Sequence, residues 1–514
     1  MTKSIKSIIT NNFGTLVSVE CHMANSLPGI TIIGYASRTV DEAKDRLRAA
    51  FSNSQLQLPK KHLTINLFPA DIQKEATTLD LAMAVSVLTA SEQVQAKRTE
   101  GCVFFGELNL AGELQPARGV IGLVATAKRL GYQTVYLPAA NLRQARLVEG
   151  VRLKPAGSLK EAYLDLAGVK QLPAITASRA ETSRHQDQLN QQIIDFNEVA
   201  GQTLAKRALE IAAAGGHNVL LSGPPGIGKS MLAKALAGIL PPLTHEQILE
   251  TTQIHSLHHQ AFENLVSSPP FRAPHHSASM TSMVGGGSRP LPGEISLAHN
   301  GVLFLDEVSE FGRSVLEALR QPIEERKVTV ARAKETITYP ADFLLIATQN
   351  PCPCGYFGSS GKRQCVCSLS AVIRYQQKLS GPILDRIDLH VAAEGVRHSS
   401  LLDSDYGEQQ ESSAAIRQRV VAARQRQRTR FGRPMTNSAM GNRDIVRFGQ
   451  LSPDAKLLLD KASGGLELSA RAYVRCVKVA RTIADLEDSA CIAESHIAEA
   501  LQYRHQPQSA LTSV

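Results

Sequence analysis

One short segment restricts the fold of this chain more than any other. The apolar run 218–222 leads directly into Gly223-Pro-Pro-Gly-Ile-Gly-Lys229-Ser230, and a helical pattern follows over residues 231–240. The spacing GxxxxGK[ST] between a strand and a helix lets backbone N–H groups close around phosphate oxygens. Lys229 would neutralise phosphate charge, and the Ser230 hydroxyl would bind Mg²⁺. The alternative is an ordinary Gly-Pro turn. We predict a phosphate site formed by Gly223, Pro224, Pro225, Gly226, Ile227, Gly228, Lys229 and Ser230.

A second apolar run, residues 301–305, ends in two adjacent carboxylates. Beside a phosphate loop, Asp306 would hold Mg²⁺ directly or through water. Glu307 would orient and deprotonate an attacking water, because phosphoryl transfer depends mainly on positioning and charge stabilisation. A strand that ends at an acidic surface turn is the alternative reading. The two motifs together predict ATP hydrolysis with Mg²⁺ as cofactor.

Two further positions could complete such a site. The apolar run 343–348 leads to Asn350, whose amide could hydrogen-bond the γ-phosphate or the water, although asparagine is also a common turn residue. Arg386 lies in the segment 381–388 and could reach a nucleotide held by a neighbouring subunit, where a planar cation stabilises transition-state charge. A local ion-pair cluster is the alternative for Arg386.

The 514 residues, 43% of them hydrophobic, allow about three domains. Residues 1–167 alternate strand-like and helical runs, such as 135–137 and 119–130. The polar stretch 175–192 predicts a linker, so we expect a linker over 168–192. Short apolar runs alternating with helices predict a parallel α/β domain over 193–397, and residues 398–514 read as helical.

Four of the eight cysteines fall within residues 352–367. The start of the chain shows no unbroken apolar stretch followed by a cleavage site, so we read no secretory signal there. No apolar run reaches the ~18 residues of a membrane-spanning helix. We therefore expect a cytoplasmic, reducing location. Four thiolates on a glycine-bearing loop could bind a structural zinc ion, and four free thiols are the alternative. The candidate zinc ligands are Cys352, Cys354, Cys365 and Cys367.

Two basic elements could contact an anionic polymer, in line with a net charge of +9. Residues 328–339 read as a β-hairpin with Arg332 and Lys334 near its tip, where a charged surface hairpin is the alternative. Residues 417–433 hold seven arginines and no acid, for which a solvated helical face is the alternative. We expect salt-dependent, sequence-tolerant binding of single-stranded or branched DNA. The candidate residues on the helix are Arg417, Arg419, Arg424, Arg426, Arg428 and Arg430.

The combined motifs resemble those of AAA+ ATPases. Five stretches, 271–307, 320–333, 350–355, 378–391 and 468–487, are similar to the magnesium-chelatase-like YifB/ComM family. The resemblance implies a homohexameric helicase that acts in DNA branch migration during natural transformation and homologous recombination, with recombination proteins as partners. It also implies that Asn350 is sensor 1, that Arg386 is an arginine finger acting in trans, and that Arg471 is sensor 2 on a helical lid.

The N-terminal region resembles the Lon-protease-like (ribosomal S5 domain 2-like) α/β fold over residues 69–81 and 106–141. Thr78 stands where this fold carries its nucleophilic serine, and Ile121 stands where it carries the base lysine. An apolar side chain cannot accept a proton, so we expect no peptidase activity and a role in ring assembly or partner docking. A metal-insertion motor of the chelatase type and a protein remodeller remain as rival functions.

Overall fold

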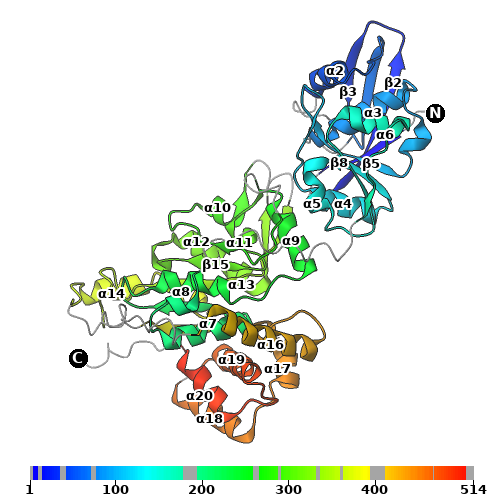
Figure 1. The fold of residues 1–514 in the computed structure, drawn as a ribbon. Coiled ribbons are helices and arrows are strands. Elements are labelled where there is room, and N and C mark those ends of the chain that lie inside the picture. Colours follow the sequence, from blue (N-terminus) through cyan, green and yellow to red (C-terminus); the bar gives the residue numbers. More distant parts are fainter. Residues whose placement is uncertain are drawn as a thin grey trace. The chain divides into compact units, whose positions relative to one another are not determined.

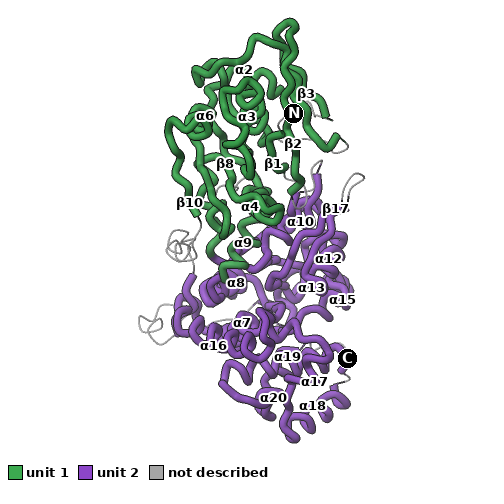
Figure 2. Tube along the Cα trace, turned by 90° about the vertical axis from the view of Figure 1, so that its right-hand side faces the viewer, with its two compact units in different colours: residues 1–188, 244–267 green, residues 189–243, 268–514 purple. Residues whose placement is uncertain are grey.

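The computed structural model describes residues 4–9, 14–34, 42–70, 77–176, 194–258, 265–287, 291–331, 336–358, 363–393, 411–466 and 468–504. The chain divides into two compact units (Figure 2). Unit 1 comprises residues 1–188 and 244–267, and unit 2 comprises residues 189–243 and 268–514. The excursion 244–267 is not among the boundaries predicted from the sequence, which place it inside the α/β domain.

Helix α9 (His245–His255) explains this excursion. It buries Ile248, Thr251 and Ile254 and packs against α4 (Val120–Arg129) within unit 1. The N–H of Gly119, the residue before α4, donates to the carbonyl of Ser256 at 3.3 Å. Contacts between segments so far apart leave no local signature in the sequence.

Unit 1 is built on a mixed eight-stranded sheet. The sheet order is β10-β9-β8-β5-β1-β2-β4-β3, and β4 shows the alternation of buried and half-buried residues that a sheet with one covered face requires. The predicted helix 119–130 and strand 135–137 correspond to α4 and β8. The strands are β1 (Ser4–Ile9), β2 (Thr15–Ala24), β3 (Gly29–Ile33), β4 (His62–Phe68), β5 (Cys102–Phe104), β8 (Thr134–Pro138), β9 (Arg152–Ala156) and β10 (Ile175–Thr176), with a separate hairpin of β6 (Glu107–Leu108) and β7 (Leu114–Gln115). The other helices are α2 (Ala43–Asn53), α3 (Asp80–Ala90), α5 (Leu142–Ala145) and α6 (Leu159–Ala167).

A buried ion pair fixes the start of α3, a helix in which all residues but the last are buried. Its first residue, Asp80, has a side chain only 1% exposed. Arg46 on α2 donates to both carboxylate oxygens, at 2.7 and 3.0 Å, and the N–H of Leu108 donates at 3.2 Å. Burial raises the pKa of Asp80 to about 6, while Arg46 opposes that shift. The carboxylate thus stays charged at neutral pH because Arg46 is present.

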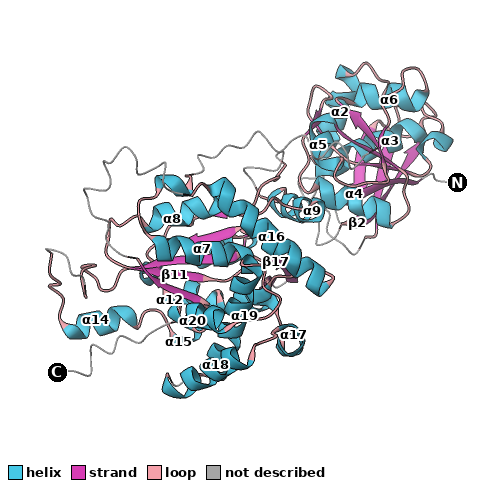
Figure 3. Cartoon of the chain, turned by 60° about the horizontal axis from the view of Figure 1, so that its bottom comes forward, coloured by secondary structure: helices cyan, strands magenta, loops and turns pink. Residues whose placement is uncertain are grey.

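Unit 2 contains a parallel five-stranded sheet in the order β12-β15-β18-β11-β19 (Figure 3). The three strands predicted from apolar runs are present within one residue of the expected positions, since parallel strands buried on both faces are apolar throughout. Helices α7 and α8 pack on the sheet. The strands are β11 (Val219–Ser222), β12 (Phe271–Arg272), β15 (Val302–Leu305), β18 (Leu344–Gln349) and β19 (Leu389–Ala392).

Short helices and hairpins surround this sheet. In the described residues after 410, the α-helices are α16 to α20, which form the C-terminal part of the chain (Figure 1). Helices α16 and α19 of this part pack against α7. The hairpin predicted over 328–339 is present, with Val328 opposite Tyr339, but Arg332 and Lys334 lie outside the described residues. The helices are α7 (Thr203–Gly215), α8 (Lys229–Ala235), α10 (Met280–Val284), α11 (Glu294–Leu297), α12 (Arg313–Ala318), α13 (Arg320–Glu325), α14 (Leu369–Gln376), α15 (Gly381–Leu384), α16 (Ser413–Phe431), α17 (Asn442–Phe448), α18 (Pro453–Gly465), α19 (Ala470–Leu486) and α20 (Glu494–Gln502). The short strands are β13 (Gly285–Gly286), β14 (Leu291–Pro292), β16 (Lys327–Ala331) and β17 (Thr336–Pro340). Among the helices described, none is both long and apolar enough to cross a membrane.

Replacing Arg46 should show how much the buried pair matters. Arg46→Met leaves the Asp80 carboxylate buried without its cation, and we expect a loss of about 3 kcal/mol in the stability of α3 at neutral pH. The pKa of Asp80 rises further in this variant, so the loss should shrink as the pH falls and the carboxylate takes up a proton. Hydrogen exchange of peptides from α3 across a urea series measures the change.

The matched control is Arg48→Met on the same helix. Arg48 pairs with Asp45 at 3.3 Å, but both side chains are more than half exposed, and such a pair contributes under about 1 kcal/mol. Equal exchange rates in the two variants would contradict the role assigned to Arg46.

Candidate active site

The sheet order of unit 2 brings the predicted motifs to one edge. Strands β15, β18 and β11 are consecutive neighbours, and all three run in the same direction. Their carboxyl ends therefore carry Asp306 and Glu307, then Asn350, then the phosphate loop that begins at Gly223. Ligands of open parallel sheets bind at this edge, next to the strand where the chain order reverses.

Lys229 lies between the phosphate loop and the end of β18. Its ammonium donates to the carbonyls of Gly223 at 2.6 Å and Pro224 at 2.8 Å, and to Oδ1 of Asn350 at 3.0 Å. Burial lowers the pKa of Lys229 to about 8, and the nearby Asp306 and Glu307 carboxylates oppose this shift. The site thus holds a buried cation whose charge depends on its anionic neighbours.

The loop backbone adopts conformations that require glycine. Gly226 and Gly228 have φ values of +81° and +90°, in the left-handed region. A Cβ at Gly223 would lie 2.6 Å from the Ala393 carbonyl oxygen, so a side chain does not fit there. The side-chain amide of Gln202 donates to the Ile227 carbonyl at 3.2 Å and supports the loop from α7's first turn.

Ser230 and Asp306 face each other across the site. The Ser230 hydroxyl donates to one Asp306 oxygen at 2.8 Å, and the Thr348 hydroxyl donates to the other at 2.5 Å. The N–H of Glu307 donates in turn to Thr348 Oγ1 at 2.8 Å. Hydroxyl and carboxylate oxygens are the ligands that Mg²⁺ prefers, so the pair Ser230 and Asp306 fits that ion.

Thr348 was not predicted from the sequence. It is fully buried near the end of β18, where a β-branched residue within an apolar run looks like core packing. Only the pairing of β18 with β15 reveals that its hydroxyl orients the carboxylate of Asp306.

Glu307 and Asn350 complete the group. Glu307 is exposed and has a φ of +50°, which turns it out of the strand direction. The Asn350 amide donates to Glu307 Oε1 at 3.4 Å while its oxygen accepts from Lys229. Asn350 therefore links the candidate phosphate-binding cation to the candidate base.

Arg386 and Arg471, the two arginines predicted to contact the nucleotide, do not belong to the group formed by Lys229, Asn350 and Glu307. Arg386 donates to the carboxylate of Glu324 at 2.7 Å and to the Pro382 carbonyl at 2.6 Å, and its side chain is 14% exposed. Arg471 is exposed at the second position of α19. In the described part of the chain, neither arginine takes part in the hydrogen bonds that join Lys229, Asn350 and Glu307.

Most arginines predicted to bind DNA on α16 have partners within the chain. Five of the six donate to carboxylates or carbonyls, and these bonds attach α16 to α7, to α19 and the turn after it, and to the turn after α8. Arg428 is exposed, and its role stays a prediction. The partners are Gly238 O for Arg417, Glu210 and Glu411 for Arg419, Ala213 O for Arg424, Asp485 O and Asp488 for Arg426, and Asp485 for Arg430.

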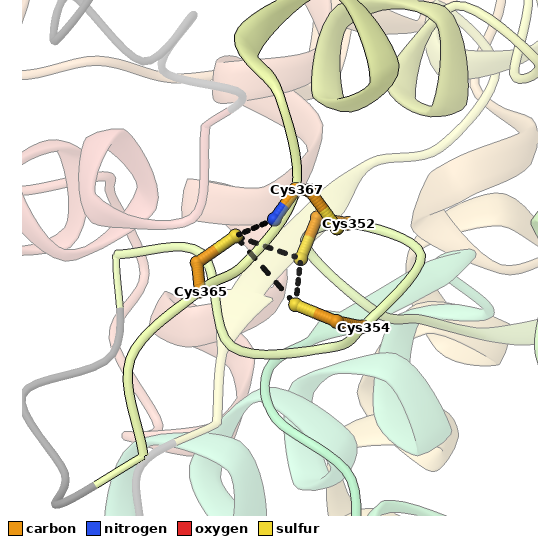
Figure 4. Close-up of side chains that lie close together, drawn as sticks. All are labelled: Cys352, Cys354, Cys365 and Cys367. Carbon is orange, nitrogen blue, oxygen red and sulfur yellow. Dashed lines mark hydrogen bonds between the residues drawn. The ribbon is translucent and has the colours of Figure 1, made fainter.

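The four cysteines converge on one point (Figure 4). Cys352 Sγ lies 3.3 Å from Cys354 Sγ and 3.7 Å from Cys365 Sγ, and all four sulfur atoms lie within 4.8 Å of one another. Zinc in a tetrahedron of thiolates, with Zn–S near 2.3 Å, needs sulfur atoms about 3.8 Å apart. Backbone N–H groups of Tyr356 and Val366 lower the pKa of Cys354 to about 6, which favours the thiolate that metals bind. The cluster is compatible with a zinc ion.

In unit 1, Thr78 and Ile121 are both buried. The Thr78 hydroxyl oxygen has no hydrogen-bond partner among the described residues, and Ile121 lies in α4. The absence of peptidase activity stays a prediction.

Family models and known proteins match this chain over most of its length. The family model described as magnesium chelatase, subunit ChlI, matches residues 195–401; those described as subunit ChlI of Mg-chelatase and its C-terminal region match 19–141 and 410–504. Competence protein ComM of Haemophilus influenzae is 42% identical over 491 residues, covering 95% of this chain and 94% of that protein. The YifB protein of Escherichia coli is 41% identical over 495 residues, with coverage of 95% and 94%. A magnesium-chelatase 67 kDa subunit of Chlorobaculum parvum is 30% identical over 166 residues, or 31% of this chain and 24% of that protein.

The phosphate loop, the acidic strand end and the parallel sheet define an AAA+-type ATPase domain of the magnesium-chelatase class, which uses ATP and Mg²⁺. The identity with ComM and YifB extends over nearly the whole length of both proteins. The chain belongs to the ComM/YifB family.

The pKa of Lys229 predicts how nucleotide binding depends on pH. A bound phosphate favours the charged lysine, so binding must take up a proton once the pH exceeds the pKa of about 8 in the free site. We expect ATP affinity to fall by about tenfold per pH unit above this value. Equilibrium titration with ATP at several pH values measures the slope.

Lys229→Arg is the control, because a guanidinium stays charged over this range. Its affinity should not change between about pH 7 and pH 9.5. A wild-type affinity that is equally constant would contradict the shifted pKa.

Proposed function

We propose that this protein is an ATP-driven ring motor that moves DNA strands, in the manner of a hexameric branch-migration helicase serving natural transformation and homologous recombination. The observation that carries this proposal is the linked group of Lys229, Asn350 and Glu307 at the edge of the sheet. The relation to competence protein ComM supports DNA as the substrate. Recombination proteins are the further partners that this role implies.

The residues divide the chemistry among themselves. The loop N–H groups and Lys229 bind the β- and γ-phosphates, and Ser230 and Asp306 hold Mg²⁺. Glu307 accepts the proton of the attacking water, and Asn350 keeps its carboxylate aligned with the γ-phosphate. Arg471, from the helical lid, adds charge to the γ-phosphate of the same subunit.

Arg386 would act on the nucleotide of the neighbouring subunit. Its own segment contacts the lid helix, because Arg475 on α19 donates to the Ile387 carbonyl at 2.9 Å. His217 lies 3.2 Å from Asp388 and 2.8 Å from Thr482 on α19, and so joins the same two elements. A lid that moves with its nucleotide would therefore move the arginine that serves the next nucleotide in the ring.

DNA would be gripped through its phosphates. The hairpin β16–β17 would carry Arg332 and Lys334 into the ring channel, and Arg428 would add charge at α16. Such contacts release counterions and read no sequence, so binding should weaken steeply with salt. Unit 1 would be a Lon-like domain without peptidase activity that serves assembly or docking.

We further propose structural zinc at the four cysteines and a cytoplasmic location. Four thiolates persist as ligands in a reducing compartment, where disulfides are rare. The four sulfur atoms already lie at distances that suit one ion.

A metal-insertion motor is the second candidate. The observation in its favour is that three family models named for magnesium chelatase match the chain. The similarity to the chelatase 67 kDa subunit, however, covers only 31% of this chain, whereas that to ComM covers 95%.

DNA-stimulated ATP hydrolysis tests the proposed function. We expect forked or single-stranded DNA to raise the ATPase rate at low salt, and Glu307→Gln to reduce turnover by about a hundredfold or more while ATP still binds. A strand-exchange assay then measures branch migration directly. A metal-insertion motor or a protein remodeller should hydrolyse ATP at a rate that DNA does not change.

Mixing two inactive variants tests the role of Arg386. Lys229→Ala removes the phosphate-binding cation and Arg386→Ala removes the finger, so each pure ring should be inactive. A mixed ring contains junctions with an intact phosphate loop facing an intact finger, and we expect part of the activity to return. Glu324→Gln, which removes the partner of Arg386, is the control and should remain active. No recovery on mixing would place Arg386 in its own subunit's site.

A further inference from the structure

The four-cysteine loop, residues 352–367, lies directly on the phosphate loop. A Cβ built on Gly355 would lie 2.6 Å from Cδ and 3.0 Å from Cγ of Pro225. The φ of Gly355 is +86°, so both space and conformation demand glycine at this position. The backbone of the cysteine loop thus supports Pro225 at a distance that no side chain would allow.

The same loop touches the site at a second place. It begins two residues after Asn350, whose side chain joins Lys229 and Glu307. Between them, the Pro351 carbonyl accepts a hydrogen bond from Gln376 at 3.1 Å. The position of Asn350 therefore depends on where the cysteine loop starts.

Among its described residues, the loop is held mainly by the sulfur cluster and by Arg363, whose guanidinium donates to the Tyr356 hydroxyl at 3.1 Å. Of its four cysteines only Cys352 is buried, and Val366 has 87% of its surface exposed. The described part of the loop contains no helix or strand. A segment with so small an apolar core needs a cross-link to keep one conformation.

We propose that the metal-bound cysteine loop is a brace for the ATP site: it positions the phosphate loop through the contact of Gly355 with Pro225, and it positions Asn350 through the chain. This inference rests on the proposed function only in taking the site to bind ATP. Loss of the metal or of the contact lowers nucleotide affinity. The phosphate loop and Asn350 are then no longer held in position in the free protein, so part of the binding free energy must be spent on ordering them.

Two glycine variants of the full-length protein separate the contact from other effects. Gly355→Ala places a methyl group against Pro225, whereas the methyl group of Gly358→Ala in the same loop meets no atom of the described residues within 4 Å. Both glycines have positive φ, +86° and +70°, so both substitutions strain the backbone in the same way. The two positions differ in the contact with Pro225 and in burial, since Gly355 is buried and Gly358 is exposed.

The readouts are zinc content by metal analysis and the dissociation constant of a fluorescent ATP analogue, measured in a Glu307→Gln background so that nothing is hydrolysed. Both variants should keep about one zinc per chain. We expect Gly355→Ala to weaken nucleotide binding about fivefold or more and Gly358→Ala to change it by less than about twofold. Equal affinities in the two variants would overturn the brace.

Metal removal tests the same inference without mutation. Stripping zinc with a chelator should weaken nucleotide binding, and adding zinc back should restore it. Cys354→Ser with Cys367→Ser should match the stripped protein, whereas Cys491→Ser, at an exposed cysteine outside the loop, should match wild type. Zinc-free protein that binds nucleotide as tightly as the loaded form overturns the brace, as does wild-type protein that carries no zinc. Wild-type protein that binds no ATP analogue at all overturns the proposed function instead.

Discussion

The ammonium of Lys229 and the side-chain oxygen of Asn350 lie 3.0 Å apart, although 121 positions separate the two residues in the chain. This contact exists because β11 and β18 are adjacent and parallel, so both strands deliver their following residues to one edge. The carboxylates after β15 arrive there for the same reason. The proposed base Glu307, the lid residue Arg471 and the arginine finger Arg386 would all act on a nucleotide bound at such an edge. Charge stabilisation at a phosphate needs groups that are held within a few ångströms before the substrate binds.

Buried charge organises the rest of the molecule. The arginines of α16 read in the sequence as a basic run. Four of them, however, donate to carboxylates and carbonyls of α7 and α19, and Arg417 donates to the Gly238 carbonyl after α8. Asp485, fully buried, accepts from Arg430 and Arg481 and from Asn437. A desolvated carboxylate is tolerated only with such partners, so these bonds around Asp485 hold the C-terminal helices α16 and α19 to each other. A count of basic residues cannot distinguish arginines that bind carboxylates and carbonyls inside the protein from arginines that bind nucleic acid, because both roles need the same side chain.

The packing of α9 on unit 1 and the position of the cysteine loop are two further features that the sequence alone does not predict. The sequence of residues 244–267 is helical in pattern, but nothing local in it says that its apolar face meets α4. The four cysteines were visible as candidate ligands from their clustering. The contact of Gly355 with Pro225 was not visible in the sequence, because it forms only when the cysteine loop and the phosphate loop are brought together by the fold.

By itself the sequence determined the local chemistry: the phosphate loop between strand and helix, the paired carboxylates, the asparagine after the third apolar run, and the thiols that could hold a metal. Each of these is a short-range pattern, and short-range patterns follow from backbone geometry and side-chain type. Only the tertiary structure decided which patterns share a site. In the folded chain, the Thr348 hydroxyl donates to Asp306 and Arg386 pairs with Glu324. Five arginines of α16 bind partners within the chain, and Gly355 contacts Pro225 of the phosphate loop. The physical reason is that strand order and helix packing are chosen by the burial of many residues together, and no single segment of the chain records that choice.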